Sequence, residues 1–145
     1  MVVTGAGTGI GRAIALRLAR EGAALTLVAR GRERLEATAA SIGGPVRVEP
    51  CDVRQRRRVE KSMTRAAGAL GPIHALVAAS GIGGPNGDDD EGGDRFDDIG
   101  QTNVNGTYYC VRGMMRHLAP QEACGRSQFA AFLSSDALAT VSSRA

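Results

Sequence analysis

The sequence has 145 residues, a formal net charge of +3, an apolar fraction of 43% and an aromatic fraction of only 3%. This length suits one domain with a core of small aliphatic side chains, and we expect residues 1–145 to form it. The small charge surplus does not indicate nucleic-acid binding, and no apolar run approaches the ~20 residues of a membrane span.

Three cysteines, Cys51, Cys110 and Cys124, lie far apart and form no CxxC pair. Only His74 and His117 are available as histidine co-ligands. A metal site or a disulfide framework is therefore not expected. We expect a reducing, cytoplasmic setting.

In chain order, short apolar runs alternate with helical stretches. Five runs have the length and composition of strands, at 1–4, 24–30, 46–53, 73–81 and 128–135. Four helices are expected between them, at 11–22, 32–44, 54–71 and 96–118. This alternation implies parallel strands with right-handed crossovers, and it predicts an α/β fold with a doubly wound sheet.

The last of these helices carries apolar residues at helical spacing. They are Ile99, Val104, Tyr108, Val111, Met115 and Leu118. The segment before this helix, 82–95, has no apolar periodicity and is expected to be a loop, with a solvated acidic run at 88–91. His74 falls in an apolar run and is expected in the core.

The glycine-rich stretch TGAGTGIG lies between the first strand and the first helix. Glycines at 5, 9 and 11 let the backbone turn tightly and approach a bulky anion. The helix behind them offers unpaired N–H groups and a partial positive charge. No Lys-Ser/Thr pair ends the stretch, as it would in a P-loop, so dinucleotide binding is the favoured interpretation.

This stretch resembles the T-G-x-x-x-G-x-G motif of the short-chain dehydrogenase/reductase family. Further matches follow in order: Asp52-Val53 after the third strand, Asn103 in TNVNG, and the Ser pair that ends at Ser135. The resemblance covers essentially the whole chain. It implies a Rossmann-type fold whose last helices and strands are missing from the C-terminal end of this sequence.

The resemblance also assigns the nucleotide-binding residues. It implies that Thr8, Ile10 and the three glycines surround the pyrophosphate, that Asp52 bonds the adenine amino group, and that Val53 packs beside the adenine ring. AASG, ending in Ala79, Ser80 and Gly81, stands where the family usually has N-N-A-G. The loss of two Asn side chains there removes hydrogen bonds at this strand end, for which Ser80 compensates in part.

The end of the second strand bears on the choice between NADP(H) and NAD(H). An acidic side chain there would bond the ribose 2′-hydroxyl of NAD. This sequence has Ala29 followed by Arg30, whose guanidinium can fork onto a 2′-phosphate. NADP(H) is therefore favoured, while NAD(H) and a merely solvated Arg30 stay open.

The catalytic residues that the resemblance implies are Ser135, which orients the substrate carbonyl, and Asn103, which anchors a water for proton relay. The family also uses a Tyr-x-x-x-Lys pair, in which the cation makes the Tyr a better base. Ala145, the last residue, comes before the position expected for that Tyr. Tyr108 with Arg112 has similar spacing, but its place in the order is wrong and core packing explains it better.

The arginine run at 54–58 has no interleaved aromatic residue and is expected on the solvent face of a helix, without a nucleic-acid partner. The leading hypothesis is an oxidoreductase that prefers NADP(H) and acts on a small carbonyl or alcohol, with this chain an incomplete copy that is inactive alone. The alternative is a non-catalytic dinucleotide-binding remnant or regulatory module. Relatives commonly pair through the long helix, so a homo-oligomer is the other partner that the resemblance allows. The open fifth strand predicts poor solubility or association.

Overall fold

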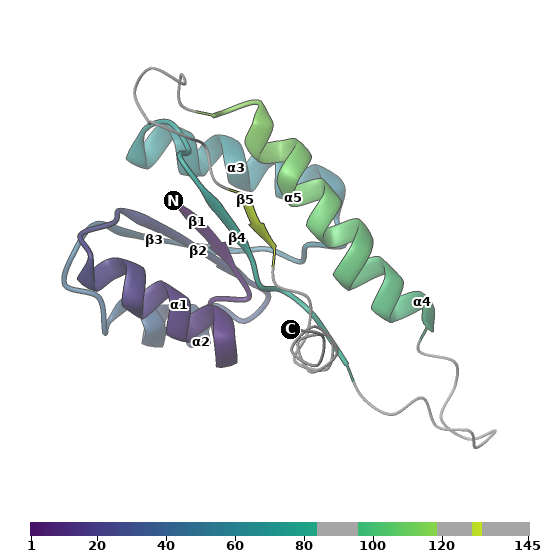
Figure 1. Ribbon diagram of the computed structural model, residues 1–145, viewed down its shortest axis with the longest axis horizontal. Coiled ribbons are helices and arrows are strands. Elements are labelled where there is room, and N and C mark those ends of the chain that lie inside the picture. Colours follow the sequence, from purple (N-terminus) through teal and green to yellow (C-terminus); the bar gives the residue numbers. More distant parts are fainter. Residues whose placement is uncertain (84–95, 119–128, 132–145) are drawn as a thin grey trace, which may run out of the picture.

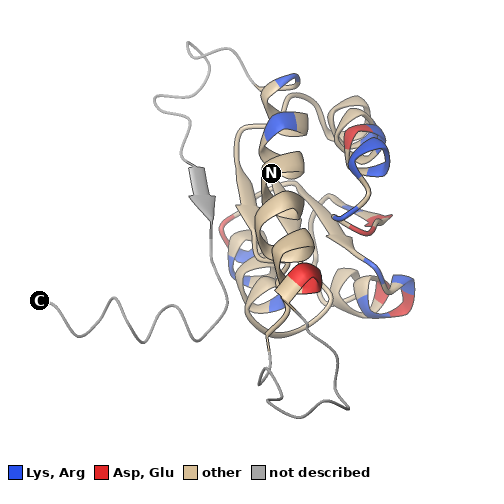
Figure 2. Ribbon diagram, turned by 90° about the vertical axis from the view of Figure 1, so that its right-hand side faces the viewer, with Lys and Arg blue, Asp and Glu red and all other residues tan. Residues whose placement is uncertain are grey.

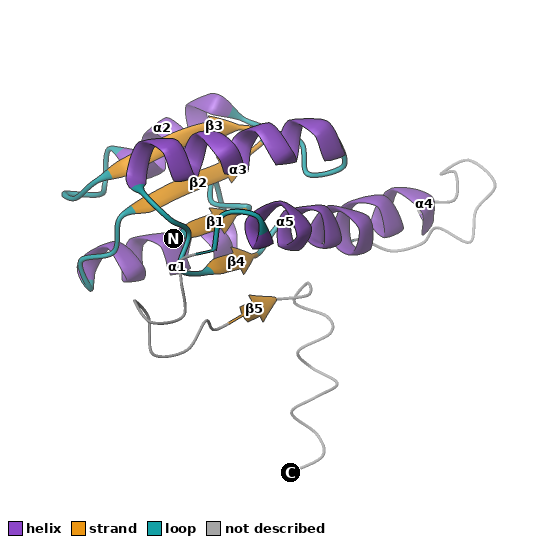
Figure 3. Cartoon of the chain, turned by 90° about the horizontal axis from the view of Figure 1, so that it is seen from above, coloured by secondary structure: helices purple, strands orange, loops and turns teal. Residues whose placement is uncertain are grey.

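The computed structural model describes residues 1–83 and 96–118, and the backbone of residues 129–131. Its centre is a five-stranded parallel sheet with the strand order β3-β2-β1-β4-β5 (Figure 3). The strands are β1 (Val2–Thr4), β2 (Leu25–Ala29), β3 (Val46–Pro50), β4 (Leu76–Ala78) and β5 (Phe129–Ala131). The order reverses between β1 and β4, which is where doubly wound sheets bind ligands.

Helices cover both faces of the sheet. They are α1 (Gly9–Arg20), α2 (Arg32–Ala39), α3 (Arg56–Leu70), α4 (Phe96–Ile99) and α5 (Gly106–Met115), with a π-helical segment η1 (Gly100–Asn105) joining α4 to α5. Figure 1 shows α1 and α2 on one side of the strands, and α3 and α5 on the other. The predicted α/β doubly wound parallel sheet is confirmed.

Alternate residues of each strand supply two separate apolar layers. Val2 of β1 packs in a cluster with residues of α3 and α5, such as Met63 and Met114. The next residue, Val3, packs in a second cluster with Ala15 of α1 and Leu35 of α2. Because successive side chains of a strand point to opposite faces, both faces of a buried parallel strand must be apolar.

Two glycines let α5 approach its neighbours closely. A Cβ atom on Gly106 would lie 2.6 Å from a methyl group of Val53, and one on Gly113 would lie 3.0 Å from Cγ of Met63. Larger residues at either position would push the helix away from the sheet. The side of α5 that carries these glycines is therefore its buried side.

Three residues of the apolar stripe noted in the sequence lie on the opposite side of the helix, whereas Val111 and Leu118 of the same stripe pack against the core. Val104 is 65% exposed, Tyr108 54% and Met115 65%. Arg112 donates a hydrogen bond to the Tyr108 hydroxyl at 3.2 Å on this outer surface. The interpretation of Tyr108 as a core residue is therefore wrong, because the glycine side of α5 takes the core position.

His74 is also exposed, contrary to expectation. The apolar run at 73–81 predicts one strand, but β4 begins only at Leu76. Ile73, which is buried, instead forms an isolated bridge with Leu118. The short strand leaves His74 in the connection between α3 and β4.

Charged residues lie mainly on the helices and strand ends (Figure 2). Among the residues that the structure describes, Glu49 of β3 is the buried charged residue, and its side chain is only 4% exposed. Arg47 and Arg65 pair with it at 2.7 and 2.6 Å. The arginine run at 54–58 is exposed, as expected. None of the helices in the described ranges has both the length and the apolar character needed to cross a membrane.

Candidate functional site

A cleft of about 710 Å³ opens at the carboxyl ends of β1 to β4. The turn after β1 forms one wall, and the residues that follow β2, β3 and β4 form the others. Thr102 of η1 also lines it. This position, at the reversal of strand order, is the usual ligand site of an open parallel sheet.

The glycine-rich turn presents the amino end of α1 to this cleft. Helix α1 begins at Gly9, and Thr8 precedes it in an extended conformation without a side-chain capping bond. No acidic residue lies in the first turn of the helix. The first N–H groups of α1 therefore have neither an intrahelical partner nor a side-chain cap, and they favour an anion.

Three glycines of the turn have different physical roles. A Cβ atom on Gly11 would collide with the Gly5 carbonyl, and one on Gly5 would collide with the Ala79 carbonyl. These two glycines allow the turn, α1 and the end of β4 to pack together. Gly9 has a φ of +51° and nothing within 4 Å of a Cβ position, so it leaves open space at the helix end.

Thr4 ties the turn to the end of β4. Its side chain is buried, and its hydroxyl oxygen accepts hydrogen bonds from the backbone N–H groups of Ala79 and Ser80, both at 3.1 Å. A hydroxyl from β1 therefore binds the backbone of this strand end, and compensation by Ser80 for the two missing Asn side chains stays a prediction. Sequence reasoning missed this role, because Thr4 was interpreted only as the start of the glycine motif.

Asp52 lies on the wall that follows β3, with Val53 beside it. Arg54 forks onto its carboxylate, with Nη2 2.9 Å from Oδ2, and the Arg54 backbone N–H donates to Oδ1 at 3.0 Å. The Arg54 side-chain hydrogen bonds, opposed by partial burial, hold the pKa of Asp52 below its ordinary value. The neighbouring Cys51 thiol has its pKa raised to about 11, first by burial and then by the Asp52 charge, so it is not a reactive thiolate.

Two arginines line the cleft beyond the end of β2. Arg30 follows the strand directly, and Arg34 comes from the first turn of α2. The Arg34 Cβ atom lies only 3.2 Å from where a Cβ on Gly7 would be. Within the described part of the chain, neither guanidinium has an ion-pair partner within 4 Å.

Asn103 lies in η1, opposite the residues that follow β4. Its side-chain oxygen accepts from the Ile82 N–H at 2.9 Å, and its side-chain nitrogen donates to the Ile82 carbonyl at 3.0 Å. The π-helical geometry at this point was not foreseen, although such segments are frequent at functional sites. Ser135 lies outside the described residues.

The structure brings together all the residues expected at the nucleotide. Those that line the cleft are Gly5, Thr8, Gly9, Ile10, Gly11, Arg30, Asp52, Val53, Ala79, Ser80 and Gly81. Their contacts with a nucleotide stay a prediction. Sequence reasoning missed Arg34 and Arg54. For Arg34, the available signal was its position four residues after Arg30. No such signal pointed to Arg54.

The sequence profile of the family described as short chain dehydrogenase matches residues 1–127. The chain belongs to this family. Membership of the short-chain dehydrogenase family implies a nicotinamide dinucleotide as the cofactor. The residues present fit such a group, because the cleft joins a free helix amino end, an acidic acceptor, and two arginines that have no ion-pair partner in the part of the chain that the structure describes.

Individual members of the short-chain dehydrogenase family are also similar to this chain in sequence and structure. The chain is 37% identical over 123 residues to the short-chain reductase protein NovJ of Streptomyces niveus, covering 83% of this chain and 47% of that protein. The crystal structure of a glucose/ribitol dehydrogenase of the family from Brucella melitensis superposes with a TM-score of 0.81 at 29% identity, covering 95% of this chain and 55% of the other.

A third similar structure is an alcohol dehydrogenase from the archaeon Thermococcus sibiricus in complex with 5-hydroxy-NADP. Its TM-score is 0.70 at 30% identity, with 80% of this chain and 51% of the other covered. The chain thus spans about half the length of the relatives it matches.

Proposed function

We propose that this chain forms the nucleotide-binding part of an oxidoreductase that prefers NADP(H) and acts on a small carbonyl or alcohol. The observation that carries the proposal is the uncapped amino end of α1, which faces a cleft large enough for a dinucleotide. Ligand sites of ~300–1,000 Å³ are typical of proteins, and the cleft volume of about 710 Å³ lies in that range.

Each wall of the cleft suits one part of a dinucleotide. The diphosphate lies against the N–H groups at Gly9, Ile10 and Gly11, where Gly9 leaves room for it. Asp52 would bond the adenine amino group, and Val53 would pack beside the adenine ring. The nicotinamide half then extends past Ser80 and Gly81 toward η1.

The preference for NADP(H) rests on the charges at the end of β2. Arg30 and Arg34 line the cleft without ion-pair partners among the described residues, so both can bind a 2′-phosphate. Of the described residues on the cleft wall, Asp52 is the acidic one, and Arg54 pairs with it. The related alcohol dehydrogenase in complex with 5-hydroxy-NADP supports this preference.

Bound in this cleft, the cofactor supplies hydride transfer. The chain binds its diphosphate and base, excludes water from its buried face, and holds the end of β4 through Asn103 and Thr4. We propose, from the family resemblance, that Ser135 orients the substrate carbonyl and that Asn103 also anchors a relay water. A Tyr and a Lys would complete proton transfer in the whole protein, which we propose forms a homo-oligomer.

A non-catalytic dinucleotide-binding module is the second candidate. It is favoured by one observation, the cleft itself, because dinucleotide binding needs only the residues that line the cleft. Both candidates bind a dinucleotide. The two candidates differ in whether the whole protein turns over a carbonyl substrate. The 145-residue chain alone should show no turnover under either candidate.

Calorimetric titration with NADPH and NADH tests the proposal. We expect one site per chain and affinity for NADPH at least tenfold above that for NADH. Arg30→Ala and Arg34→Ala should each reduce this ratio, whereas Arg20→Ala, which removes an exposed arginine at the far end of α1, should leave it unchanged. Equal affinities would overturn the NADP(H) preference, and no binding of either nucleotide would overturn the function itself.

A further inference from the structure

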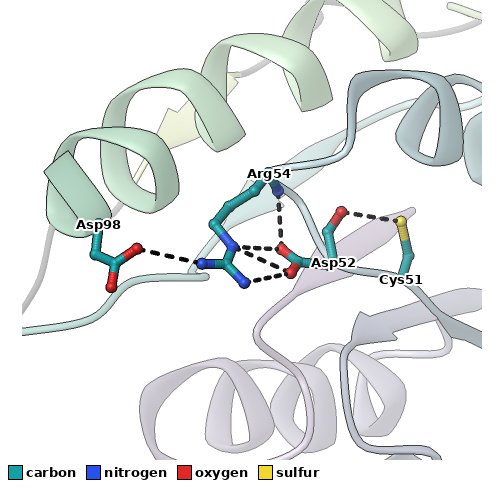
Figure 4. Close-up of polar contacts among 4 residues, drawn as sticks. All are labelled: Cys51, Asp52, Arg54 and Asp98. Atoms are coloured by element: carbon teal, nitrogen blue, oxygen red, sulfur yellow. Dashed lines mark hydrogen bonds and ion pairs between the residues drawn. The ribbon is translucent and has the colours of Figure 1, made fainter.

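Among residues 1–83 and 96–118, one residue, Arg54, donates hydrogen bonds to the Asp52 carboxylate. The Arg54 Nε lies 3.2 Å from Oδ1 and 3.1 Å from Oδ2, while Nη2 lies 2.9 Å from Oδ2 (Figure 4). The Arg54 backbone N–H adds a bond to Oδ1 at 3.0 Å. Both side-chain and backbone donors of one residue therefore fix the plane of this carboxylate.

This arrangement leaves the carboxylate with limited acceptor capacity. An ionised carboxylate has about four lone-pair positions. Arg54 occupies both oxygens with three N–H groups, of which the Nε–H is shared. These are four contacts, two at each oxygen, but the shared Nε–H binds neither oxygen fully, so one further donor can still approach. Asp52 lines the cleft with its side chain 15% exposed.

Arg54 is itself held from a second side. Its Nη1 lies 3.4 Å from Oδ1 of Asp98 in α4, a residue 44 positions away in the sequence. Asp98 is 65% exposed, so this ion pair adds little energy by itself. It does hold the guanidinium between two carboxylates, as Figure 4 shows, and a planar guanidinium bonded on both edges has little freedom to rotate.

We propose that Arg54 is a positioning residue of the nucleotide site, which orients Asp52 so that its remaining acceptor takes the exocyclic amino group of adenine. The inference rests on the proposed function, because it requires a dinucleotide in the cleft. It assigns selectivity for the base to the Asp52–Arg54 pair rather than to Asp52 alone. Neutralisation of Asp52 by Arg54 also lowers the repulsion between this wall and a polyanionic ligand.

Base selectivity can be measured with two ligands that differ at one group. NADPH carries the adenine amino group, and nicotinamide hypoxanthine dinucleotide phosphate in its reduced form has a carbonyl oxygen at the same place. A hydrogen bond to a charged acceptor predicts about tenfold or greater preference of the wild-type chain for the adenine form. The ratio of the two affinities is insensitive to the folded fraction, because both ligands are titrated into the same protein.

Three substitutions separate orientation from charge. Arg54→Ala removes the fork, and we expect the affinity ratio to fall to within about threefold of unity. Arg54→Lys keeps the charge without the fork, so its ratio should fall equally while its affinity for both ligands stays closer to wild type. Arg56→Ala, the matched control, removes a nearby exposed arginine that pairs with Glu60 and should leave the ratio unchanged.

Asp52→Asn tests whether the ratio of the two affinities reports a hydrogen bond from the base to the Asp52 side chain. Its side-chain amide can donate to the hypoxanthine oxygen, so the preference for adenine should disappear or reverse. Retention of the wild-type ratio in Arg54→Ala, or its rescue by Arg54→Lys, would overturn the positioning role. Tight binding of both ligands by wild type without preference would overturn this inference and leave the proposed function standing. No saturable binding by the folded chain would overturn both.

Discussion

Asn103 binds both backbone polar groups of Ile82 and so holds the segment after β4 against η1. The two hydrogen bonds are 2.9 and 3.0 Å long, and they join residues 21 positions apart in the sequence. A Cβ atom on Gly81 would lie 3.3 Å from the Asn103 side-chain oxygen, so the preceding residue also lies close. Asn103 therefore holds the outer part of the cleft wall at Ile82, while Thr4 holds the same wall at Ala79 and Ser80.

Asn103→Ala should lower the free energy of unfolding by about 1–2 kcal/mol, because it leaves a part-buried N–H and carbonyl without their partners. Asn105→Ala is the matched control, since Asn105 lies in the same π-helical segment and bonds only to the exposed Gln101 side chain. That change should cost less than about 0.5 kcal/mol. Equal losses of unfolding free energy for the two variants, measured by urea denaturation, would show that the Asn103 hydrogen bonds do not stabilise the fold more than those of Asn105.

Gly9→Ala should separate binding from folding. Its φ of +51° costs an alanine about 1–2 kcal/mol, and the methyl group enters the open space where the diphosphate is proposed to lie. We expect at least a tenfold loss of NADPH affinity from a chain that still folds. Gly68→Ala, in α3 with nothing near its Cβ, should instead stabilise the helix by up to about 1 kcal/mol. Unchanged affinity in Gly9→Ala would place the diphosphate elsewhere.

The environment of Glu49 makes the free energy of unfolding sensitive to acid. Burial by itself would raise the pKa of Glu49, but hydrogen bonds from Arg65 and Arg47 outweigh it, so the pKa lies below its ordinary value near 4.5. A carboxyl group with a lowered folded-state pKa contributes stability above its unfolded pKa and loses it as the pH falls through the folded value. Stability should therefore fall below about pH 4.5.

Glu49→Gln should cost about 1–2 kcal/mol at pH 7, less than a fully buried pair, because both arginines reach solvent. It should also flatten the acid limb of the stability curve. Glu36→Gln, at an exposed helical ion pair, serves as the control. Parallel pH profiles for wild type and Glu49→Gln, measured by chemical denaturation, would contradict this account.

The outward apolar stripe of η1 and α5 predicts self-association of the isolated chain. Val104 and Met115 are each 65% exposed and lie on the same outer side as Tyr108. Replacing both with Lys should lower the sedimentation coefficient toward that of the monomer, since Lys preserves helix propensity and removes apolar surface. Lysines at the exposed Ala37 and Ala69 add the same charge elsewhere and should not do so. A monodisperse wild-type monomer at high concentration would contradict the prediction.

Local patterns were sufficient to predict the sheet, its helices and the glycine turn. Val2 and Val3 show why: consecutive apolar residues in a strand require cover on both faces, which a doubly wound arrangement supplies. Which face of α5 is buried could not be predicted in the same way. Its apolar stripe suggested a core face, but Gly106 and Gly113 decide the packing because they allow closer approach than any larger residue.

The cleft was predicted from motif residues, whereas its supporting contacts were not. Thr4 acts through a bond to Ala79, which lies near it only because β1 and β4 are placed side by side. Arg54 binds Asp52, two residues away, and the motif that names Asp52 and Val53 does not include it. His74 was misplaced because apolar composition does not show where a strand begins. Ser135, at the end of the predicted fifth strand, lies outside the described residues, and its catalytic role stays a prediction.

The central claim is that a dinucleotide diphosphate lies against the amino end of α1. The most direct measurement is an NMR titration of the 145-residue chain with NADPH, following the backbone amides. The account predicts that Gly9, Ile10 and Gly11 show the largest saturable shifts, with smaller changes at Asp52 and Ser80. Saturable binding that leaves these three amides unmoved would contradict it.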